Sequence, residues 1–210
     1  MPILDNKLNV GIVIVAVLAA VVVVAVMLLG RAPEGSQSGG QGSQAALRSG
    51  MAAPDFSLQD TNGTAVALAG YRGKQQVLVY AHEGLACAPC IEQMATLEQL
   101  KPELAKLNVT PLSVSPEAPA QQRPTVDQYQ LTYPVLSHAG TSMTKDYDLY
   151  RFSMGHGDKP GHTFILVDVD GTVKWRKDYW PGVGMSVPGG TMFVEKPELL
   201  DTIKRAVGSP

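Results

Sequence analysis

The feature that most restricts the fold of this chain is a buried-strand pattern running directly into a cysteine pair and an amphipathic helix. Residues 75–82, "QQVLVYAH", form an apolar run typical of a strand buried on both faces of a sheet. Cys87 and Cys90 follow it. Apolar residues then recur every three or four positions from Ile91 to Leu107, which predicts a helix beginning near Cys90. A strand followed by such a helix is typical of a unit in which the helix connects the strand to a second strand running parallel to it in the same sheet.

The remaining patterns predict a mixed sheet. Pro102 lies inside the helical pattern and is expected to kink or split that helix. We expect two short strands around Asn62-Gly63, a buried strand over 109–115, a helix within 116–130, a hairpin of 162–167 and 172–177 turning at Asp170-Gly171, and a closing helix over 197–207. This order predicts an α/β fold over residues 51–210, with a mixed central sheet flanked by helices.

A second feature is the uncharged apolar run over residues 10–30. As a helix it reaches about 30 Å, the thickness of the hydrocarbon core of a bilayer. It is longer than the apolar region of a signal peptide, and neither a clean small-residue cleavage site nor a cysteine for lipid attachment follows it. We therefore expect a transmembrane anchor embedded in the lipid bilayer.

The segments around this run complete the expected domain organisation. Residues 1–9 form a short tail, which stays most easily in the cytoplasm, and residues 31–50 form a flexible linker rich in Gly, Ser and Gln. The protein is thus expected to be a single-pass cell-membrane protein whose folded domain is extracytoplasmic. The net charge of −2 and the lack of a basic run argue against nucleic acid as a partner.

The spacing of the two cysteines allows several kinds of chemistry. Cys87 lies just before the expected helix, whose positive end favours a thiolate and lowers the thiol pKa, and Pro89 suits the first helical turn. Two intervening residues allow Cys90 to reach back and resolve a mixed disulfide on Cys87. The alternatives are a static disulfide, inert cysteines, or half of a zinc site, which would require two further ligands from the histidines. The setting favours a redox pair.

Three further residues are candidates for supporting the pair. Glu83 and His82 lie within five residues of Cys87, and either can accept or donate a proton; alternatively, they are a solvated glutamate and a strand-end histidine. His162 begins the late hairpin, which the expected fold directs at the cysteines. It either stabilises the thiolate or simply fills space. The sequence indicates no organic cofactor and no resident metal.

These residues carry a family resemblance covering roughly residues 51–177. "LACAPC" after "VLVYAHEG", the upstream "APDFSLQDTNGTAVAL" and the downstream "HTFILVDVDGTV" resemble thioredoxin-fold redoxins. More narrowly, they are similar to the alkyl hydroperoxide reductase/thiol-specific antioxidant (peroxiredoxin) family and to membrane-tethered thiol–disulfide oxidoreductases. The resemblance implies that Cys87 is the attacking thiol and Cys90 its partner.

The chain departs from both groups at defined positions. Thioredoxin-type proteins usually carry Trp before the first cysteine and a cis-proline ahead of the late strand, where this chain has Ala86 and Gly161-His162. Peroxiredoxins usually carry Thr three residues before the attacking cysteine and Arg near the start of the late strand, where this chain has Gly84 and His162.

Three functions follow from the resemblance. The first is a membrane-anchored thiol–disulfide oxidoreductase, acting on protein disulfides and reset by a separate thiol electron donor. The alternative within the enzymes is a thiol-dependent peroxidase with antioxidant activity, acting on peroxides. The alternative from another class is a copper carrier on the same fold, although such carriers usually space their cysteines by three residues and add a distant histidine.

Overall fold

The computed structural model describes residues 47–152, 159–179 and 192–208. These residues belong to one folded unit that begins near residue 45. The expected anchor over 10–30, the tail over 1–9 and most of the linker lie outside the described residues. Within the described ranges, no helix is both long enough and apolar enough to cross a membrane.

The folded unit alternates strands and helices as the sequence patterns predict. In chain order its elements are β1 (Ser57–Asp60), β2 (Ala65–Ala67), the 3₁₀ turn η1 (Leu68–Gly70), β3 (Gln76–Ala81), α2 (Ala88–Lys106), β4 (Val109–Ser115), α3 (Pro119–Tyr129), β5 (Val135–Ser137), α4 (Met143–Asp146), η2 (Tyr150–Phe152), β6 (Thr163–Val167), β7 (Val173–Asp178) and α5 (Lys196–Gly208). Each predicted strand and helix of the folded domain is present.

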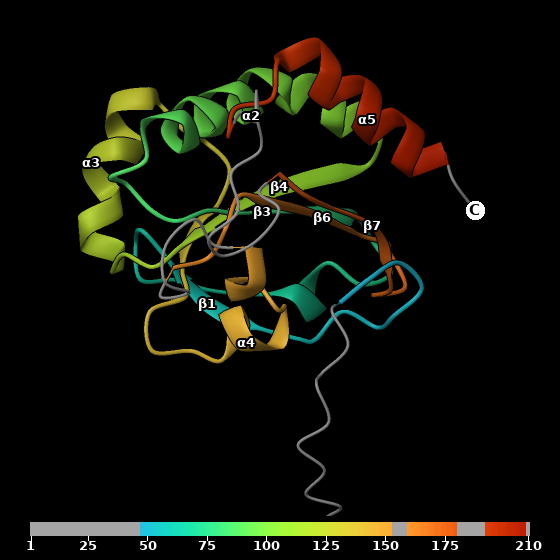
Figure 1. The fold of residues 1–210 in the computed structure, drawn as a ribbon, viewed down its shortest axis with the longest axis horizontal. Helices are drawn as coiled ribbons and strands as arrows, with labels where there is room; N and C mark the ends of the chain where they lie inside the picture. Colours follow the sequence, from blue (N-terminus) through green and yellow to red (C-terminus); the bar gives the residue numbers. More distant parts are fainter. Residues whose placement is uncertain (1–46, 153–158, 180–191, 209–210) are drawn as a thin grey trace, which may run out of the picture. The chain divides into compact units, whose positions relative to one another are not determined.

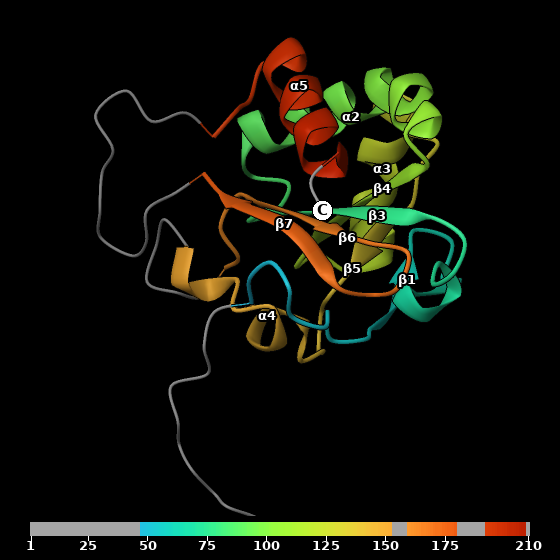
Figure 2. The same ribbon diagram turned by 90° about the vertical axis from the view of Figure 1, so that its right-hand side faces the viewer.

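The strands form one mixed sheet in the order β2-β1-β5-β4-β3-β6-β7 (Figures 1 and 2). The central strands β3, β4 and β5 are parallel, because α2 and α3 provide the crossovers between them. β6 and β7 form the predicted antiparallel hairpin beside β3. The predicted mixed sheet flanked by helices is therefore confirmed, and it has a thioredoxin-like arrangement.

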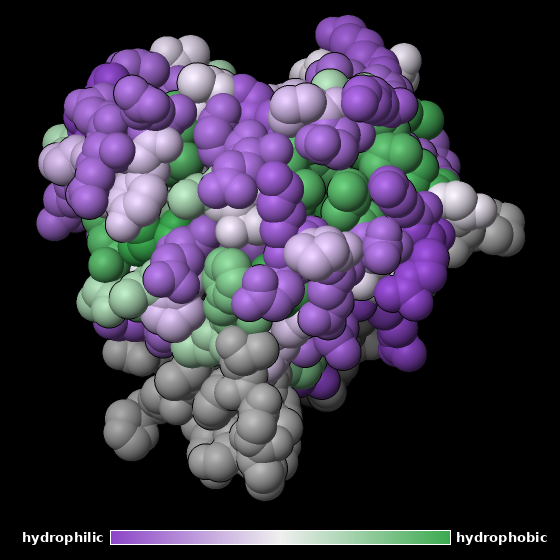
Figure 3. All heavy atoms as spheres, turned by 90° about the horizontal axis from the view of Figure 1, so that it is seen from above, coloured by the Kyte–Doolittle hydropathy of each residue, from purple (hydrophilic) through white to green (hydrophobic). Residues whose placement is uncertain are grey.

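Residues of β3 alternate between two apolar cores, one on each face of the sheet. Val77 and Val79 pack into the core on the face that carries α4. Leu78 and Tyr80 pack into the core beneath α2 and α5. Hydrophilic side chains cover much of the outer surface on the α2 and α5 side, with apolar side chains visible between them (Figure 3). Burial on both faces explains the continuous apolar run of the β3 sequence.

The structure differs from the sequence predictions in three places. Helix α2 starts at Ala88 and continues through Pro102 without splitting, because Leu97, Leu100 and Leu104 anchor the residues on both sides of the proline in the core. Residues 47–50 were expected in the flexible linker. Instead, Leu47 is only 4% exposed and its carbonyl accepts a hydrogen bond from Arg176. The short elements β5 and α4 were not predicted.

Candidate active site

The cysteine pair lies at the amino-terminal end of α2, as the strand–cysteine–helix pattern predicts. Cys87 is the N-cap of the helix, its Sγ accepts the Cys90 N–H at 3.2 Å, and Pro89 lies in the first turn. The two cysteines form a disulfide with a Cα–Cα distance of 5.2 Å. Cys87 is 7% exposed and Cys90 is completely buried. An incoming thiol can therefore reach the disulfide only at Cys87.

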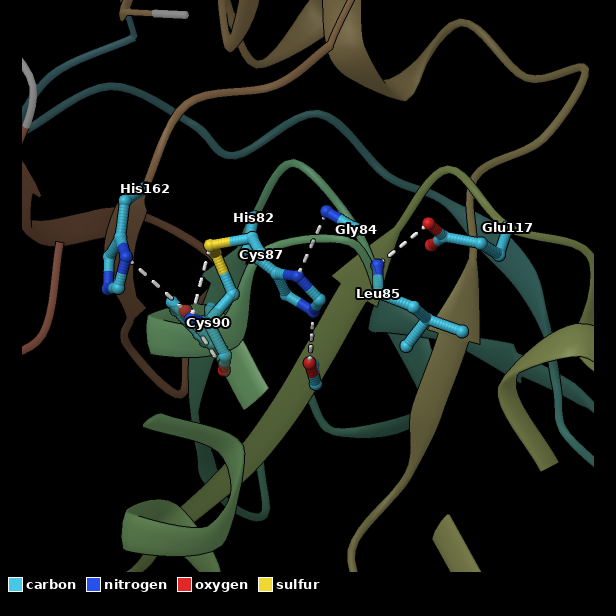
Figure 4. Close-up of a disulfide and its surroundings, with 9 residues drawn as sticks. His82, Gly84, Leu85, Cys87, Cys90, Glu117 and His162 are labelled. Atoms are coloured by element: carbon cyan, nitrogen blue, oxygen red, sulfur yellow. Dashed lines mark hydrogen bonds between the residues drawn. A yellow bond between two sulfur atoms is a disulfide. The ribbon is translucent and has the colours of Figure 1, made fainter. Parts of the chain in front are cut away.

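Several strand ends bring other polar residues to the same edge of the sheet. His82 follows β3, Glu117 follows β4 and His138 follows β5, because the carboxyl ends of parallel strands meet at one edge. His162 joins them from the start of β6, which is antiparallel to β3. Figure 4 shows His82, Glu117 and His162 around the loop that ends at Cys87. The topology thus builds one polar site from segments distant in sequence.

His82 is buried and occupied by local hydrogen bonds rather than directed at the cysteines. Its Nδ1 accepts the Gly84 N–H at 3.3 Å, which leaves the proton on Nε2, 3.0 Å from the Ser113 hydroxyl. Burial lowers the pKa of His82 to about 4, although nearby Glu117 raises it in part. His82 is therefore neutral near pH 7. These contacts fit the alternative interpretation of a strand-end histidine.

His162 is also buried and packs against an aromatic cluster. Its ring lies 4.8 Å from the Tyr80 ring and meets Tyr179 edge-on at 5.7 Å. The Tyr80 hydroxyl lies 3.4 Å from both His162 Nδ1 and the Cys90 carbonyl oxygen, so it links the histidine to the cysteine backbone. Burial lowers the pKa of His162 to about 3, which disfavours the cation that would stabilise a thiolate by charge.

Glu83 is a candidate that the structure places beside the sulfur atoms. A carboxylate oxygen of Glu83 and the Sγ atoms of Cys87 and Cys90 all lie within 4.8 Å of one another. Glu83 is half-buried, so its carboxylate can exchange protons with the solvent as well as with the sulfurs. Among the described residues, these three are the donor set that could hold a metal ion once the disulfide is reduced.

Tyr80 and Glu117 contact the site but were missed by sequence reasoning. Burial raises the pKa of Tyr80 well above its ordinary value, so the phenol stays protonated and acts as a hydrogen-bond donor. Glu117 accepts the Leu85 N–H at 2.8 Å. The only sequence signals were a hydroxyl within an otherwise apolar strand and a glutamate just after the next strand. Neither pattern shows which residue, distant in sequence, the side chain contacts in the folded protein.

The two buried histidines near the cysteines should make the fold acid-sensitive. Because their folded-state pKa values are depressed below about 6.5, the unfolded chain binds protons that the folded chain does not. Their stabilising contribution is complete above pH 6.5 and is lost as the pH falls through the folded-state pKa of each. We expect the loss from His82 alone to reach about 3 kcal/mol by pH 4.

Urea unfolding at several values between pH 7 and pH 4.5 measures this effect. In the variant His82→Gln, the slope of unfolding free energy against pH should decrease by about 1 kcal/mol per pH unit, averaged over that interval. An unchanged slope would mean that His82 is not held neutral in the folded protein.

Comparisons with known proteins agree with the geometry. Residues 49–176 match the AhpC/TSA family. Peroxiredoxin Q of the Arabidopsis thaliana chloroplast is 30% identical over 134 residues, which are 62% of this chain and 59% of that protein. The matched stretch spans only 57–60% of the length of the plant relatives.

Two solved structures illustrate the range of proteins that share the fold. A yeast mitochondrial 1-Cys peroxiredoxin superposes with a TM-score of 0.62 at 18% identity, covering 75% of each chain. A Bacteroides thetaiotaomicron protein described as a protein disulfide isomerase superposes with a TM-score of 0.58 at 18% identity, covering 78% of this chain and 92% of that one. At such identities the likeness concerns the fold alone.

A thioredoxin-like sheet with a cysteine pair opening the helix after its central strand defines a redox protein of the peroxiredoxin-like class. The family match covers more than half of the chain, and the chain belongs to the AhpC/TSA family. The predicted resemblance to the alkyl hydroperoxide reductase/thiol-specific antioxidant family is therefore confirmed.

Proposed function

We propose that this protein is a thiol-dependent peroxidase in which Cys87 is the attacking thiol and Cys90 resolves it. The observation that carries the proposal is the AhpC/TSA match, which includes the strand, the cysteine pair and the helix that bears it. Peroxiredoxin Q proteins are among the relatives that match over this segment. This proposal favours the peroxidase over the exchange function that the sequence alone placed first.

The reaction balances with the two cysteines and one external dithiol. The Cys87 thiolate attacks one peroxide oxygen, the O–O bond breaks, and the released alkoxide or hydroxide takes up a proton, leaving a sulfenic acid on Cys87. The Cys90 thiol then displaces water from that sulfenic acid and forms the disulfide. A separate dithiol reduces the disulfide by two exchange steps, the first at Cys87.

Local groups offer two kinds of assistance to this reaction. Cys87 caps α2, where the unpaired N–H groups and the helix dipole favour a thiolate. The Glu83 carboxylate lies close to both sulfurs, so it can take up the proton that the Cys87 thiol releases and then, as the carboxylic acid, pass it to the leaving oxygen. Gly84 and His162 stand where peroxiredoxins usually carry Thr and Arg, so peroxide activation here depends on other groups.

The electron donor and the location are further parts of the proposal. The yeast peroxiredoxin is resolved through glutathione and thioredoxin systems, so a thioredoxin-like dithiol is the donor proposed here. Residues 10–30 are proposed to anchor the protein in the cell membrane, with the peroxidase domain extracytoplasmic. An engineered cysteine after Pro210, tested with a membrane-impermeant maleimide in intact cells, would be labelled if this topology is right.

Thiol–disulfide exchange with protein substrates is the second candidate function. It is favoured by the C-x-x-C disulfide at a helix start, with one nearly buried and one fully buried sulfur. Against it, residues 161–162 ahead of β6 lack proline, and the described residues contain no cis peptide bond. The loop therefore lacks the cis-proline that thioredoxin-type proteins usually place there.

One experiment separates the two functions. The purified full-length protein is mixed with hydrogen peroxide or an alkyl hydroperoxide and a thioredoxin-coupled NADPH assay, and in parallel with scrambled ribonuclease. The proposal expects peroxide consumption that depends on Cys87 and a much slower recovery of ribonuclease activity. Brisk ribonuclease repair with no peroxide consumption above the background rate would contradict it.

A further inference from the structure

A carboxylate occupies the space beside Gly84 in the loop that presents Cys87. A Cβ atom at Gly84 would lie 2.1 Å from Oε1 of Glu117 and 2.9 Å from its Cδ, closer than real Cβ contacts. Gly84 also has φ +117°, a backbone conformation that side chains disfavour. The positive φ is what favours glycine here, while the close contact shows that the Glu117 carboxylate packs directly against the Gly84 backbone, where a side chain would displace it.

Glu117 and His82 together hold two successive N–H groups of this loop. Oε1 of Glu117 accepts the Leu85 N–H at 2.8 Å, and Nδ1 of His82 accepts the Gly84 N–H at 3.3 Å (Figure 4). The Gly84 carbonyl in turn accepts the Cys87 N–H at 3.2 Å. The turn from Gly84 to Cys87 is therefore fixed from outside by side chains that follow two different strands.

This turn determines where the sulfur of Cys87 lies. Cys87 has the extended backbone of an N-cap, and its Sγ accepts the Cys90 N–H at the start of α2. A thiolate at this position is stabilised by that N–H and by the helix dipole. If the turn loosens, the sulfur loses this alignment and its pKa rises.

The charge of Glu117 acts in the opposite direction. The carboxylate raises the pKa values of both His82 and His138, so its field extends through this edge of the sheet. A negative charge near Cys87 raises the thiol pKa; the Glu83 carboxylate, within 4.8 Å of both sulfurs, is common to all the variants below, and Glu117 adds a second such charge. The hydrogen bond and the charge of Glu117 therefore have opposite effects on Cys87, which allows an experiment to tell them apart. In addition, Oε2 of Glu117 is buried without a hydrogen-bond partner in the described part of the chain.

We infer that Glu117 is a positioning residue for Cys87: its hydrogen bond to the Leu85 N–H holds the Gly84–Cys87 turn and so keeps the Cys87 thiolate at the amino-terminal end of α2. The inference rests on the proposed role of Cys87 as the attacking thiol. It applies to peroxide reduction and to disulfide exchange alike, because both need that thiolate.

Two variants separate the hydrogen bond from the charge. Glu117→Gln keeps the length and the acceptor oxygen but removes the charge, whereas Glu117→Asp keeps the charge but is one methylene too short to reach the Leu85 N–H. Each is made in full-length Cys90→Ser protein, so that Cys87 is the only thiol. The rate of Cys87 alkylation by iodoacetamide is then measured from pH 5 to pH 10, which gives the thiol pKa and needs no peroxidase activity.

The inference predicts opposite results for the two variants. Glu117→Gln should leave the Cys87 pKa unchanged or slightly lower, and Glu117→Asp should raise it by about one unit, with a roughly tenfold slower alkylation at pH 6.5. Glu117→Ala, which loses the charge as well as the hydrogen bond, should raise the Cys87 pKa slightly less than Glu117→Asp does. Glu195→Ala, at an exposed position ahead of α5, should resemble the parent protein.

The outcomes that overturn the inference are equally distinct. If Glu117→Gln lowers the pKa strongly while Glu117→Asp leaves it unchanged, the charge governs Cys87 and the hydrogen bond does not. If neither variant changes the pKa, Glu117 does not position Cys87. Circular dichroism of each variant shows whether it is folded, and Glu117→Ala takes the place of Glu117→Asp in the comparison with Glu117→Gln if the aspartate variant does not fold. Loss of peroxidase activity in the parent would affect the proposed function but not this test.

Discussion

Replacing Cys87 with serine is expected to abolish peroxide consumption, whereas Cys90→Ser should leave a single stoichiometric turnover. Cys87 is the partly accessible sulfur at the start of α2, so it is the one placed to attack. A serine hydroxyl at that position is not ionised near pH 7 and is a far weaker nucleophile, so the rate should fall by roughly 10³-fold or more. Cys90 is buried and can act only on Cys87.

The two variants give different products as well as different rates. In Cys90→Ser, one equivalent of peroxide should convert Cys87 to a sulfenic acid, seen as the gain of one oxygen in the intact mass and trapped by dimedone. Cys87→Ser should show neither product. Peroxide consumption that survives in Cys87→Ser but fails in Cys90→Ser would reverse the proposed roles of the two cysteines.

The fold was predictable because its long elements carry local patterns. β3 and β4 are buried on both faces and read as apolar runs, while the spacing of apolar residues in α2 and the Asp170-Gly171 turn identify a helix and a hairpin. The strand β5 has three residues, and its strand conformation depends on pairing with β4 and β1 rather than on its own sequence. Such pairing leaves no local pattern.

The candidate site was predictable only in the part that is contiguous in sequence. Cys87 and Cys90 stand on one strand–helix junction, so their spacing and setting were sufficient to single them out. The bond from Leu85 to Glu117 joins residues 32 positions apart and depends on the parallel arrangement of β3 and β4. His82 was named for its closeness to Cys87 in sequence, but its ring nitrogens are directed at Gly84 and Ser113.

Gly161→Ala is expected to be among the most destabilising single substitutions in the described part of the chain. A Cβ at Gly161 would lie 2.0 Å from the carbonyl oxygen and 2.5 Å from the carbonyl carbon of Phe152. Both are backbone atoms, so no side-chain rotation can relieve the overlap, and one of the two segments must move. We expect the free energy of unfolding, measured with urea on the oxidised protein, to fall by about 3 kcal/mol.

The position of Gly161 connects this loss of stability to the site. Its neighbour His162 packs on Tyr80, whose hydroxyl reaches the Cys90 carbonyl, so a shift at Gly161 should also change the reduction potential of the cysteine pair.

The matched control is Gly70→Ala, where an added Cβ meets nothing within 4 Å and the glycine does not have a positive φ. That variant should stay within about 0.5 kcal/mol of the parent. If Gly161→Ala proved as stable as Gly70→Ala, the packing of Phe152 against the loop ahead of β6 would be wrong. The geometry that places His162 beside Tyr80 would then be wrong with it.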